Sequence, residues 1–455
     1  MSRKLSFSVD DEANEVVKRY EQFLAGSSAG YFDIEEMESI VEYYLRRGRT
    51  KDSSKALELG LQLHPNSNTL KIKRGKIYLA VGDINKALQT LNSLSENTEY
   101  EALILKTEVL LRLGRSKEAF ALALSILENE TEELDNICLD LAYIYLGQID
   151  FEKAIYFLEK GDKFFDKNID LLFELAFCYE QSVASQKAIE TYNRIIDIDS
   201  YSPEAWFNLG QVYFAEQNFT KALEAYEFSL TIDETDALTV LQKGHAHFQL
   251  DQFEQAIEAY LEYEKLVEDK WQAQLFIAEC YENMERYEES ILHYTQSLEA
   301  HPDNFDALTG IGICLLEKEE YAESMEFVQR ALAINNEAPD AWVYLAEGLM
   351  GMNQISDSLA AYLKSLELEP NQPDTLMAVG NILLENGDFQ NALKYYLAVE
   401  AQDSTLELLN LFIAVAYYKT DDVIQTLVYL RKAELDNENA SVLFLELCPE
   451  ATNIV

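Results

Sequence analysis

The stretch that decides the fold runs from Pro203 to Asp236 and reads PEAWFNLGQVYFAEQNFTKALEAYEFSLTIDETD. Its first half carries apolar or small residues at i, i+3, i+4 and i+7, which are Trp206, Leu209, Gly210 and Tyr213. Its second half repeats this helical spacing after a polar break, with Ala222, Tyr226 and Leu230. Each segment is too short to be stable as an isolated helix. The stretch therefore predicts a helical hairpin that must stack on copies of itself.

Copies of this stretch follow one another along the chain. With Pro203 as position 1, position 20 holds a small residue every 34 residues, and this register continues without a gap from Asp135 to Ala440. Upstream, Ser53 and Ala87 are 34 residues apart, and Ala119 follows after 32. Twelve repeats result, and they start near Ile34, Asn68, Tyr100, Asp135, Ile169, Pro203, Ala237, Trp271, Phe305, Pro339, Pro373 and Glu407.

Position 8 supports the same register independently, because ten of the twelve repeats have Gly or Ala there. A glycine inside a helix costs about 1 kcal/mol relative to alanine. A small residue that recurs at one position of the repeat therefore predicts close contact between helices at that position. Prolines agree, since Pro203, Pro339 and Pro373 open first helices, where a missing N–H does no harm.

The repeat resembles the tetratricopeptide repeat (TPR). The resemblance rests on the order and spacing of a tryptophan, Leu-Gly, a tyrosine, a small residue, an aromatic residue and a terminal proline. The resemblance implies an all-α fold, a right-handed α-solenoid of stacked antiparallel helix pairs. The expected organisation is a capping helix and linker over 1–33, twelve repeats over 34–440, and a capping helix and tail over 441–455. The first capping helix is expected to start at Asp10 and Asp11 and to end near Leu24.

Composition narrows the classes of function. Lys and Arg number 36 against 81 Asp and Glu, so the net charge is −45. This charge argues against non-specific binding to nucleic acid or to anionic membranes, and it favours basic partners. Hydrophobic residues make up 48% of the chain, so the sequence is not that of an acidic disordered protein.

The cysteines and the first residues of the chain indicate the cellular compartment. Cys138, Cys178, Cys280 and Cys314 fall at packing positions of their helices, and no Cys-x-x-Cys or Cys/His ligand spacing occurs. The first residues are no signal peptide, because charged Asp10 and Asp11 precede any apolar core. Buried free thiols suit a reducing compartment. The sequence therefore predicts a cytoplasmic protein without membrane insertion, metal or cofactor.

A basic island interrupts the acidic chain in the first two repeats. Between positions 46 and 76 there are nine cations against two acids, Asp52 and Glu58. The cations are Arg46, Arg47, Arg49, Lys51, Lys55, Lys71, Lys73, Arg74 and Lys76. Such an asymmetry fits a contact with an acidic partner or with an acidic part of another copy, and it equally fits a solvated turn region.

The stripe not used for packing is the candidate binding surface. Positions 2, 5, 9 and 12 lie on a different side of the first helix from the packing positions, and the resemblance to TPR proteins implies that they line a concave groove. Position 6 adds Glu174 and Phe276, and the candidates in repeats four to eight are then Tyr143, Asp170, Phe173, Glu174, Phe177, Glu204, Phe207, Phe214, His245, Phe248, Phe276, Glu279 and Glu282. These residues either bind a partner or pack neighbouring first helices, and the sequence alone leaves both readings open.

The sequence gives no sign of catalysis. His245 and His247 are two residues apart, so they leave one helix on different sides. No phosphate-binding loop or nucleophile elbow occurs. We therefore expect a non-enzymatic scaffold or adaptor that binds an apolar, basic segment of a protein partner. The alternatives are a structural protein that self-assembles through the basic island and, more distantly, an RNA-binding adaptor.

Overall fold

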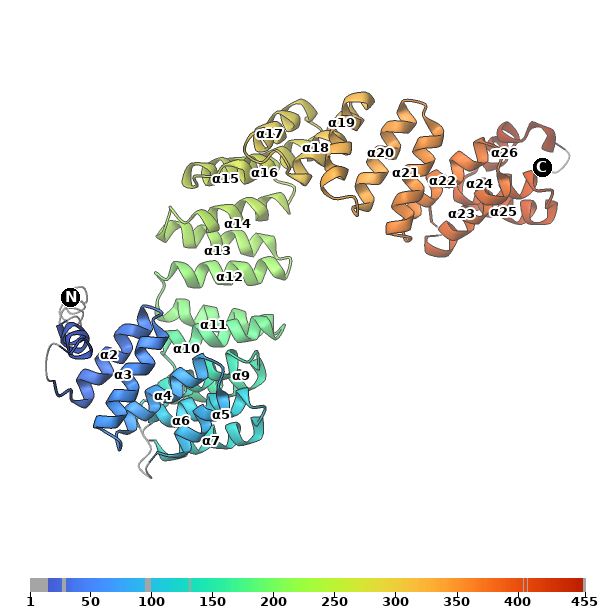
Figure 1. Ribbon diagram of the computed structural model, residues 1–455. Helices are drawn as coiled ribbons and strands as arrows, with labels where there is room; N and C mark the ends of the chain where they lie inside the picture. Colours follow the sequence, from blue (N-terminus) through green and yellow to red (C-terminus); the bar gives the residue numbers. More distant parts are fainter. Residues whose placement is uncertain are drawn as a thin grey trace. The chain divides into compact units, whose positions relative to one another are not determined.

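A computed structural model describes residues 15–26, 30–94, 100–130, 132–403, 405–406 and 408–452 (Figure 1). Within these ranges the secondary structure is helical, and no strand occurs. The chain divides into two compact units, Met1–Glu216 and Gln217–Val455.

The first unit begins with helical residues 15–24. Its further helices are α2 (Ile34–Arg46), α3 (Thr50–Leu63), α4 (Asn68–Ala80), α5 (Ile84–Asn92), α6 (Tyr100–Arg112), α7 (Ser116–Asn129), α8 (Leu134–Leu146), α9 (Phe151–Phe164), α10 (Ile169–Gln181), α11 (Ser185–Ile198) and α12 (Pro203–Ala215).

The second unit continues the same alternation of short helices and ends in a 3-10 turn. Its elements are α13 (Phe219–Ile232), α14 (Ala237–Phe248), α15 (Phe253–Leu266), α16 (Trp271–Asn283), α17 (Tyr287–Ala300), α18 (Phe305–Glu317), α19 (Tyr321–Ile334), α20 (Pro339–Gly351), α21 (Ile355–Leu368), α22 (Pro373–Glu385), α23 (Phe389–Gln402), α24 (Leu409–Lys419), α25 (Val423–Asp436), α26 (Ala440–Leu447) and η1 (Pro449–Ala451).

The helices follow the 34-residue register. Even-numbered helices α2 to α24 are the first helices of the repeats, and odd-numbered helices α3 to α25 are the second helices. Ten of the twelve predicted starts coincide with the first residue of a helix, whereas α8 begins at Leu134 and α24 at Leu409. Within each unit a helix packs chiefly on the helices next to it in sequence. This nearest-neighbour packing is that of an α-solenoid.

Small residues at positions 8 and 20 let the two helices of a repeat approach closely. Four buried serines at position 20 donate their Oγ to the carbonyl of position 8 in the same repeat. These bonds join Ser53 to Val41, Ser290 to Ala278, Ser324 to Gly312 and Ser358 to Ala346, at 3.2, 2.9, 2.8 and 2.8 Å. The prediction that the recurrent small residue marks close helix contact is thus confirmed.

The helices at the two ends pack on their neighbouring repeats. Val17 and Tyr20 are buried in one apolar cluster with Phe32, whereas Leu24, near which the helix was expected to end, is 58% exposed. The expected cap at Asp10 and Asp11 lies outside the described residues. At the other end Phe444 of α26 is buried, and Ala451 of the following turn, within the expected tail, is buried as well.

The turn between the two helices of every repeat contains a left-handed residue at position 15. These residues, all with positive φ, are Gly48, Gly82, Gly114, Ile149, Val183, Gln217, Asp251, Glu285, Glu319, Asn353, Gly387 and Asp421. A left-handed residue commonly ends a helix, and glycine suits it best. Ile149 and Val183 are the poorest fit, because a β-branched side chain is strained at positive φ. Both are also highly exposed.

Replacing Val183 by glycine is expected to raise the free energy of unfolding of the first unit by about 0.5–1 kcal/mol. Relief of about 1–2 kcal/mol of left-handed strain exceeds the added entropy of glycine in the unfolded chain, about 0.5–1 kcal/mol. The matched control is Gly114→Ala at the same position, where no heavy atom lies within 4 Å of an added Cβ. That variant should be destabilised. Urea denaturation measures both changes, and changes of the same sign would contradict the strain argument.

Candidate functional site

The first helices α6 and α8 of the first unit enclose a surface hollow of about 470 Å³. Tyr143, predicted as a binding residue, lies in this hollow and is 47% exposed. The residues around it are Tyr100, Glu101, Ile104, Glu108, Arg112, Asp140, Tyr143, Ile144, Gly147 and Gln148. Most of them had not been predicted. The residues from Tyr100 to Arg112 belong to repeat three, which precedes the repeats considered, and the others occupy positions of repeat four that were not assigned to the stripe.

The hollow combines aromatic rings with carboxylates. The Tyr100 hydroxyl donates to Asp140 Oδ2 at 2.8 Å. Desolvation raises the pKa of Tyr143 to about 12, and the nearby carboxylate of Glu174 adds to this shift. Two of the carboxylates are paired within the chain, since Glu108 binds Arg112 at 2.8 Å and Glu101 binds Lys76 at 2.5 Å.

The next first helices, α10 and α12, extend this face. Phe177 is 44% exposed and makes an edge contact with Phe151, with 6.3 Å between ring centroids. Phe173 is half-buried and contacts Tyr192 at 6.2 Å, so it belongs partly to the packing between helices. The other candidates on these helices divide into exposed Asp170 and Glu204 and half-buried Glu174, Phe207 and Phe214.

In the second unit, His245 and Phe276 come together. Their ring centroids are 4.7 Å apart, and the Tyr260 hydroxyl lies 2.9 Å from His245 Nδ1. Burial lowers the pKa of His245, so the imidazole is neutral near pH 7. Phe248 in turn contacts Phe253 at 5.5 Å. These aromatic candidates are therefore half-buried packing residues with one edge at the surface.

Carboxylates gather on the first helices α16 and α18. Desolvation raises the pKa of Glu279 to about 7, helped by the negative charges of Asp306 and Glu282. Desolvation also raises the pKa of Glu282, although the Tyr294 hydroxyl donates to its Oε2 at 2.7 Å. No lysine or arginine among the described residues contributes to either shift. The two glutamates thus form a half-buried acidic site without a cation.

The same pattern continues one helix further, beyond the range in which candidates had been predicted. Glu347 on α20 has its pKa raised by desolvation and then by Glu317 of α18. Three successive first helices of the second unit therefore present carboxylates toward one another.

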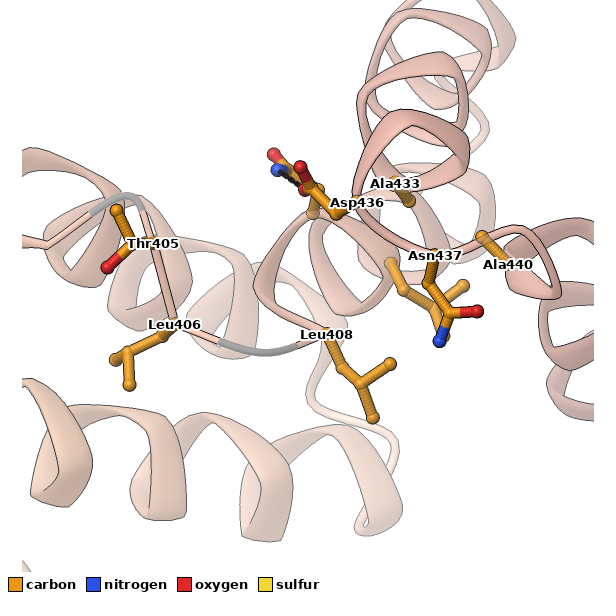
Figure 2. Close-up of a pocket in the computed structure, with 9 residues that line it drawn as sticks. Thr405, Leu406, Leu408, Ala433, Asp436, Asn437 and Ala440 are labelled. Atoms are coloured by element: carbon orange, nitrogen blue, oxygen red, sulfur yellow. Dashed lines mark hydrogen bonds between the residues drawn. The ribbon is translucent and has the colours of Figure 1, made fainter.

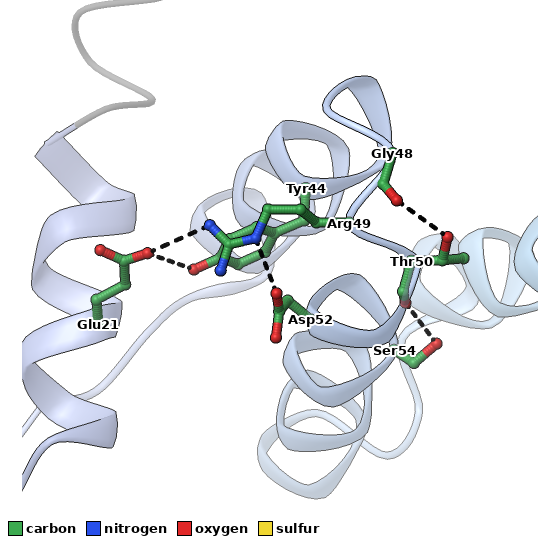
Figure 3. A network of polar contacts seen from close by, with 7 residues as sticks. All are labelled: Glu21, Tyr44, Gly48, Arg49, Thr50, Asp52 and Ser54. Carbon is green, nitrogen blue, oxygen red and sulfur yellow. Dashed lines mark hydrogen bonds and ion pairs between the residues drawn. The ribbon is translucent and has the colours of Figure 1, made fainter.

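In the described part of the chain, four of the nine cations of the basic island bind acids, and three of these acids, Glu21, Glu42 and Glu101, lie outside the island's own stretch of sequence. Arg49 binds Asp52 at 2.8 Å and lies 3.9 Å from Glu21, which also accepts from the Tyr44 hydroxyl (Figure 3). Lys73 pairs with Glu42, and Lys76 with Glu101.

Two further arginines of the island also have neighbours. Arg46 lies 3.8 Å from Glu42, and the Arg47 guanidinium stacks 3.6 Å above the ring of Tyr43. The island is therefore a partly paired surface rather than a free cationic patch.

Another hollow, of about 370 Å³, lies beside α24 and α25 (Figure 2). Leu406, Leu408 and Leu411 supply apolar walls, and Asn410 donates to Asp436 Oδ2 at 2.7 Å. Two neighbours in sequence, Ser404 and Glu407, lie outside the described residues, and we assign this hollow no function.

Several features bear on chemistry and on location. Cys138, Cys178, Cys280 and Cys314 are buried free thiols, and desolvation raises the pKa of each to about 12. In the described part of the chain no three His, Cys, Asp or Glu side chains come together as metal ligands would. Nor does any described helix combine the length and the apolar character that crossing a bilayer requires.

Paired short helices in a fixed register, with one exposed stripe per repeat, define an α-solenoid repeat protein. Comparison with sequence families agrees. One model of the tetratricopeptide repeat matches residues 203–236, and a second matches residues 241–294, 281–339 and 345–406. Over residues 203–236, 241–339 and 345–406 the chain therefore consists of tetratricopeptide repeats.

Other comparisons find similar proteins and solved structures, two of which are named as tetratricopeptide repeat proteins. The TPR repeat-containing protein MJ1428 of Methanocaldococcus jannaschii is 27% identical over 229 residues, which is 45% of this chain and 36% of that protein. A solved tetratricopeptide repeat protein of Parabacteroides merdae has a TM-score of 0.44 at 14% identity, covering 55% of this chain and 99% of its own. Pseudomonas aeruginosa pilF has a TM-score of 0.43 at 18% identity, covering 48% and 98%. These likenesses bear on neither activity nor partner.

Proposed function

We propose that the chain is a non-enzymatic binding module whose first helices hold a protein segment with apolar anchors and lysine or arginine side chains. The observation that carries this proposal is the acidic site of Glu279 and Glu282, which is desolvated and has no cation among the described residues. Carboxylates that lack a cation in such a desolvated site are unfavourable. A cation from a partner would remove this penalty, so that a partner with lysine or arginine would bind more tightly than one without.

The first unit contains exposed aromatic side chains that would bind the apolar residues of the partner segment. Tyr143 and Phe177 stand on successive first helices, and each leaves nearly half of its side chain exposed. Exposed aromatic side chains next to acids are typical anchors of protein interfaces, in which a few residues give most of the affinity. Asp140 and Asp170, which lie close enough to influence Tyr143, would attract a basic segment.

Replacing Phe177 by alanine is expected to weaken partner binding about tenfold or more, the loss typical of an aromatic anchor. A peptide selected on the full chain from a displayed library serves as the probe, and fluorescence anisotropy gives its affinity. The matched control is Phe164→Ala, which removes an equally exposed ring (46%) from the second helix α9. Unchanged affinity in Phe177→Ala together with Tyr143→Ala would remove the first unit from the proposal.

Self-assembly through the basic island is the weaker candidate. Arg46, Arg49, Lys73 and Lys76 already bind acids of the same chain, so fewer cations are left for a second copy. Light scattering across a salt series tests this candidate, because association between opposite charges must weaken as salt increases. RNA binding is weaker still, since the net charge of −45 repels phosphate.

A further inference from the structure

The outer face of α25, the second helix of the last repeat, differs from that of the other second helices. Its exposed stripe contains Ile424, Leu427, Val428 and Leu435, with Ile424 76% and Leu435 88% exposed. The buried residues Thr426, Tyr429, Leu430 and Ala433 lie on the opposite side of the helix. The stripe is therefore not part of the core of the unit.

The equivalent positions of the preceding repeats show how unusual this face is. At position 18, where Ile424 stands, repeats four to eleven have Glu152, Gln186, Thr220, Glu254, Glu288, Ala322, Ser356 and Gln390. At position 29, where Leu435 stands, they have Lys163, Asp197, Thr231, Lys265, Glu299, Ala333, Glu367 and Ala401. None of these sixteen residues is a large apolar one. Leu427 stands at position 21, which is apolar in repeats four to eleven as well, so the residues that distinguish α25 are Ile424 and Leu435 near the two ends of the stripe. Large apolar side chains that are exposed at positions polar or small elsewhere indicate an interaction site.

Charges around the stripe indicate what covers it. Asp421 and Asp422 precede the helix, and Glu434 and Glu438 are exposed at its other end. Arg431 lies within the stripe and has no ion-pair partner among the described residues. An apolar band with acids at both ends is complementary to an amphipathic helix that carries basic residues at both ends.

A second copy of this chain fits the stripe less well. If two α25 helices packed antiparallel with Ile424 against Leu435, Asp421 of one copy would oppose Glu438 of the other, and like charges would meet at both ends. Parallel packing would set each acid against its own equivalent. The net charge of −45 on every copy adds to this repulsion.

We propose that the outer face of α25 is a second docking surface, separate from the first-helix faces, and that its occupant is an amphipathic helix of another protein with lysine or arginine at both ends. Ile424 and Leu435 are the apolar contacts. The flanking acids set the preference for a basic partner, and Arg431 accommodates an acid near the middle of the incoming helix.

Two designed helical peptides test this proposal on the full chain. Both carry leucine at i, i+3, i+4 and i+7, and one has lysines at both ends where the other has glutamates. We expect the lysine peptide to bind at least about tenfold more tightly, and the double variant Ile424→Gln, Leu435→Gln to lose this binding. The control Leu292→Gln removes an exposed leucine (54%) from the outer face of α17 and should change nothing.

Other outcomes overturn the proposal. Absence of binding, equal affinity for the two peptides, or unchanged affinity in the double variant would each remove the surface. A concentration-dependent dimer that the double variant abolishes would assign the face to a second copy instead. Because the substituted side chains are exposed, far-UV circular dichroism should show an unchanged fold. The lysine peptide also has the character proposed for the partner of the first-helix face, so Phe177→Ala is measured beside the double variant. Phe177→Ala should leave unaltered the part of the binding that Ile424→Gln, Leu435→Gln removes, so that the two proposals can fail separately.

Discussion

Replacing Gly380 by alanine is expected to lower the free energy of unfolding of the second unit by about 1–2 kcal/mol. An added Cβ would lie only 2.5 Å from Cε1 of Tyr396. This ring cannot move away, because it is fully buried, stacks on Phe412 and donates its hydroxyl to Asn381 Oδ1 at 2.8 Å. Overpacking of this kind costs about 1–3 kcal/mol, which exceeds the gain of about 1 kcal/mol from replacing a helical glycine.

The matched control is Gly75→Ala, at the same position of the second repeat. There an added Cβ would lie 3.2 Å from Leu105 Cδ2, which is the end of a flexible side chain. The higher helix propensity of alanine should then outweigh the steric cost of the added Cβ. The variant should be as stable as the wild type or up to about 1 kcal/mol more stable. Urea denaturation monitored by circular dichroism measures both. Equal effects would show that position 8 is not in tight contact with position 24.

Replacing Glu279 by glutamine should stabilise the second unit at pH 8 by up to about 3 kcal/mol and have no effect near pH 4. The pKa of Glu279 is raised from its ordinary 4.5 to about 7 in the folded protein. A carboxyl group with a raised pKa does not lower the free energy of unfolding while it is protonated in both the folded and the unfolded state, at pH values below 4.5. The penalty grows as the pH rises from 4.5 to 7, because the unfolded state then ionises more readily.

The control for this prediction is Glu299→Gln, which removes an exposed carboxylate from the same unit. Its effect on the free energy of unfolding should be small at both pH values. If Glu279→Gln were equally neutral at pH 8, the desolvated acidic site would be disproved. A basic peptide bound at this site should also bind more tightly at pH 8 than at pH 6, because ionised Glu279 attracts its cation.

Register and helix pairing could be predicted from the sequence because they depend on local spacing. Prolines at first-helix starts and small residues at positions 8 and 20 fix the 34-residue period, and packing then follows from each repeat in turn. The left-handed residue at position 15 could be foreseen only where glycine stands. At Ile149 and Val183 the residue type gives no such signal, since the turn imposes its backbone on whatever residue occupies it.

The site was predictable in part. Selecting fixed positions of each first helix identifies Tyr143 and Phe177 as candidates. The selection does not distinguish an exposed ring from one that packs against the next first helix, as His245 packs against Phe276. The ion pairs of the basic island were missed because acids about one repeat away, such as Glu42 for Lys73, approach only in the folded stack. The raised pKa of Glu279 likewise depends in part on the charge of Asp306 on α18, which no local pattern reveals.

The central claim is that partners bind to the first helices. Photo-crosslinking tests it most directly, with the selected peptide carrying a benzophenone side chain and mass spectrometry locating the crosslinked residues on the full chain. We predict crosslinks on α6, α8 and α10 of the first unit or on α14, α16 and α18 of the second, competed by unlabelled peptide. Specific crosslinks confined to second helices such as α9 or α17 would contradict the claim.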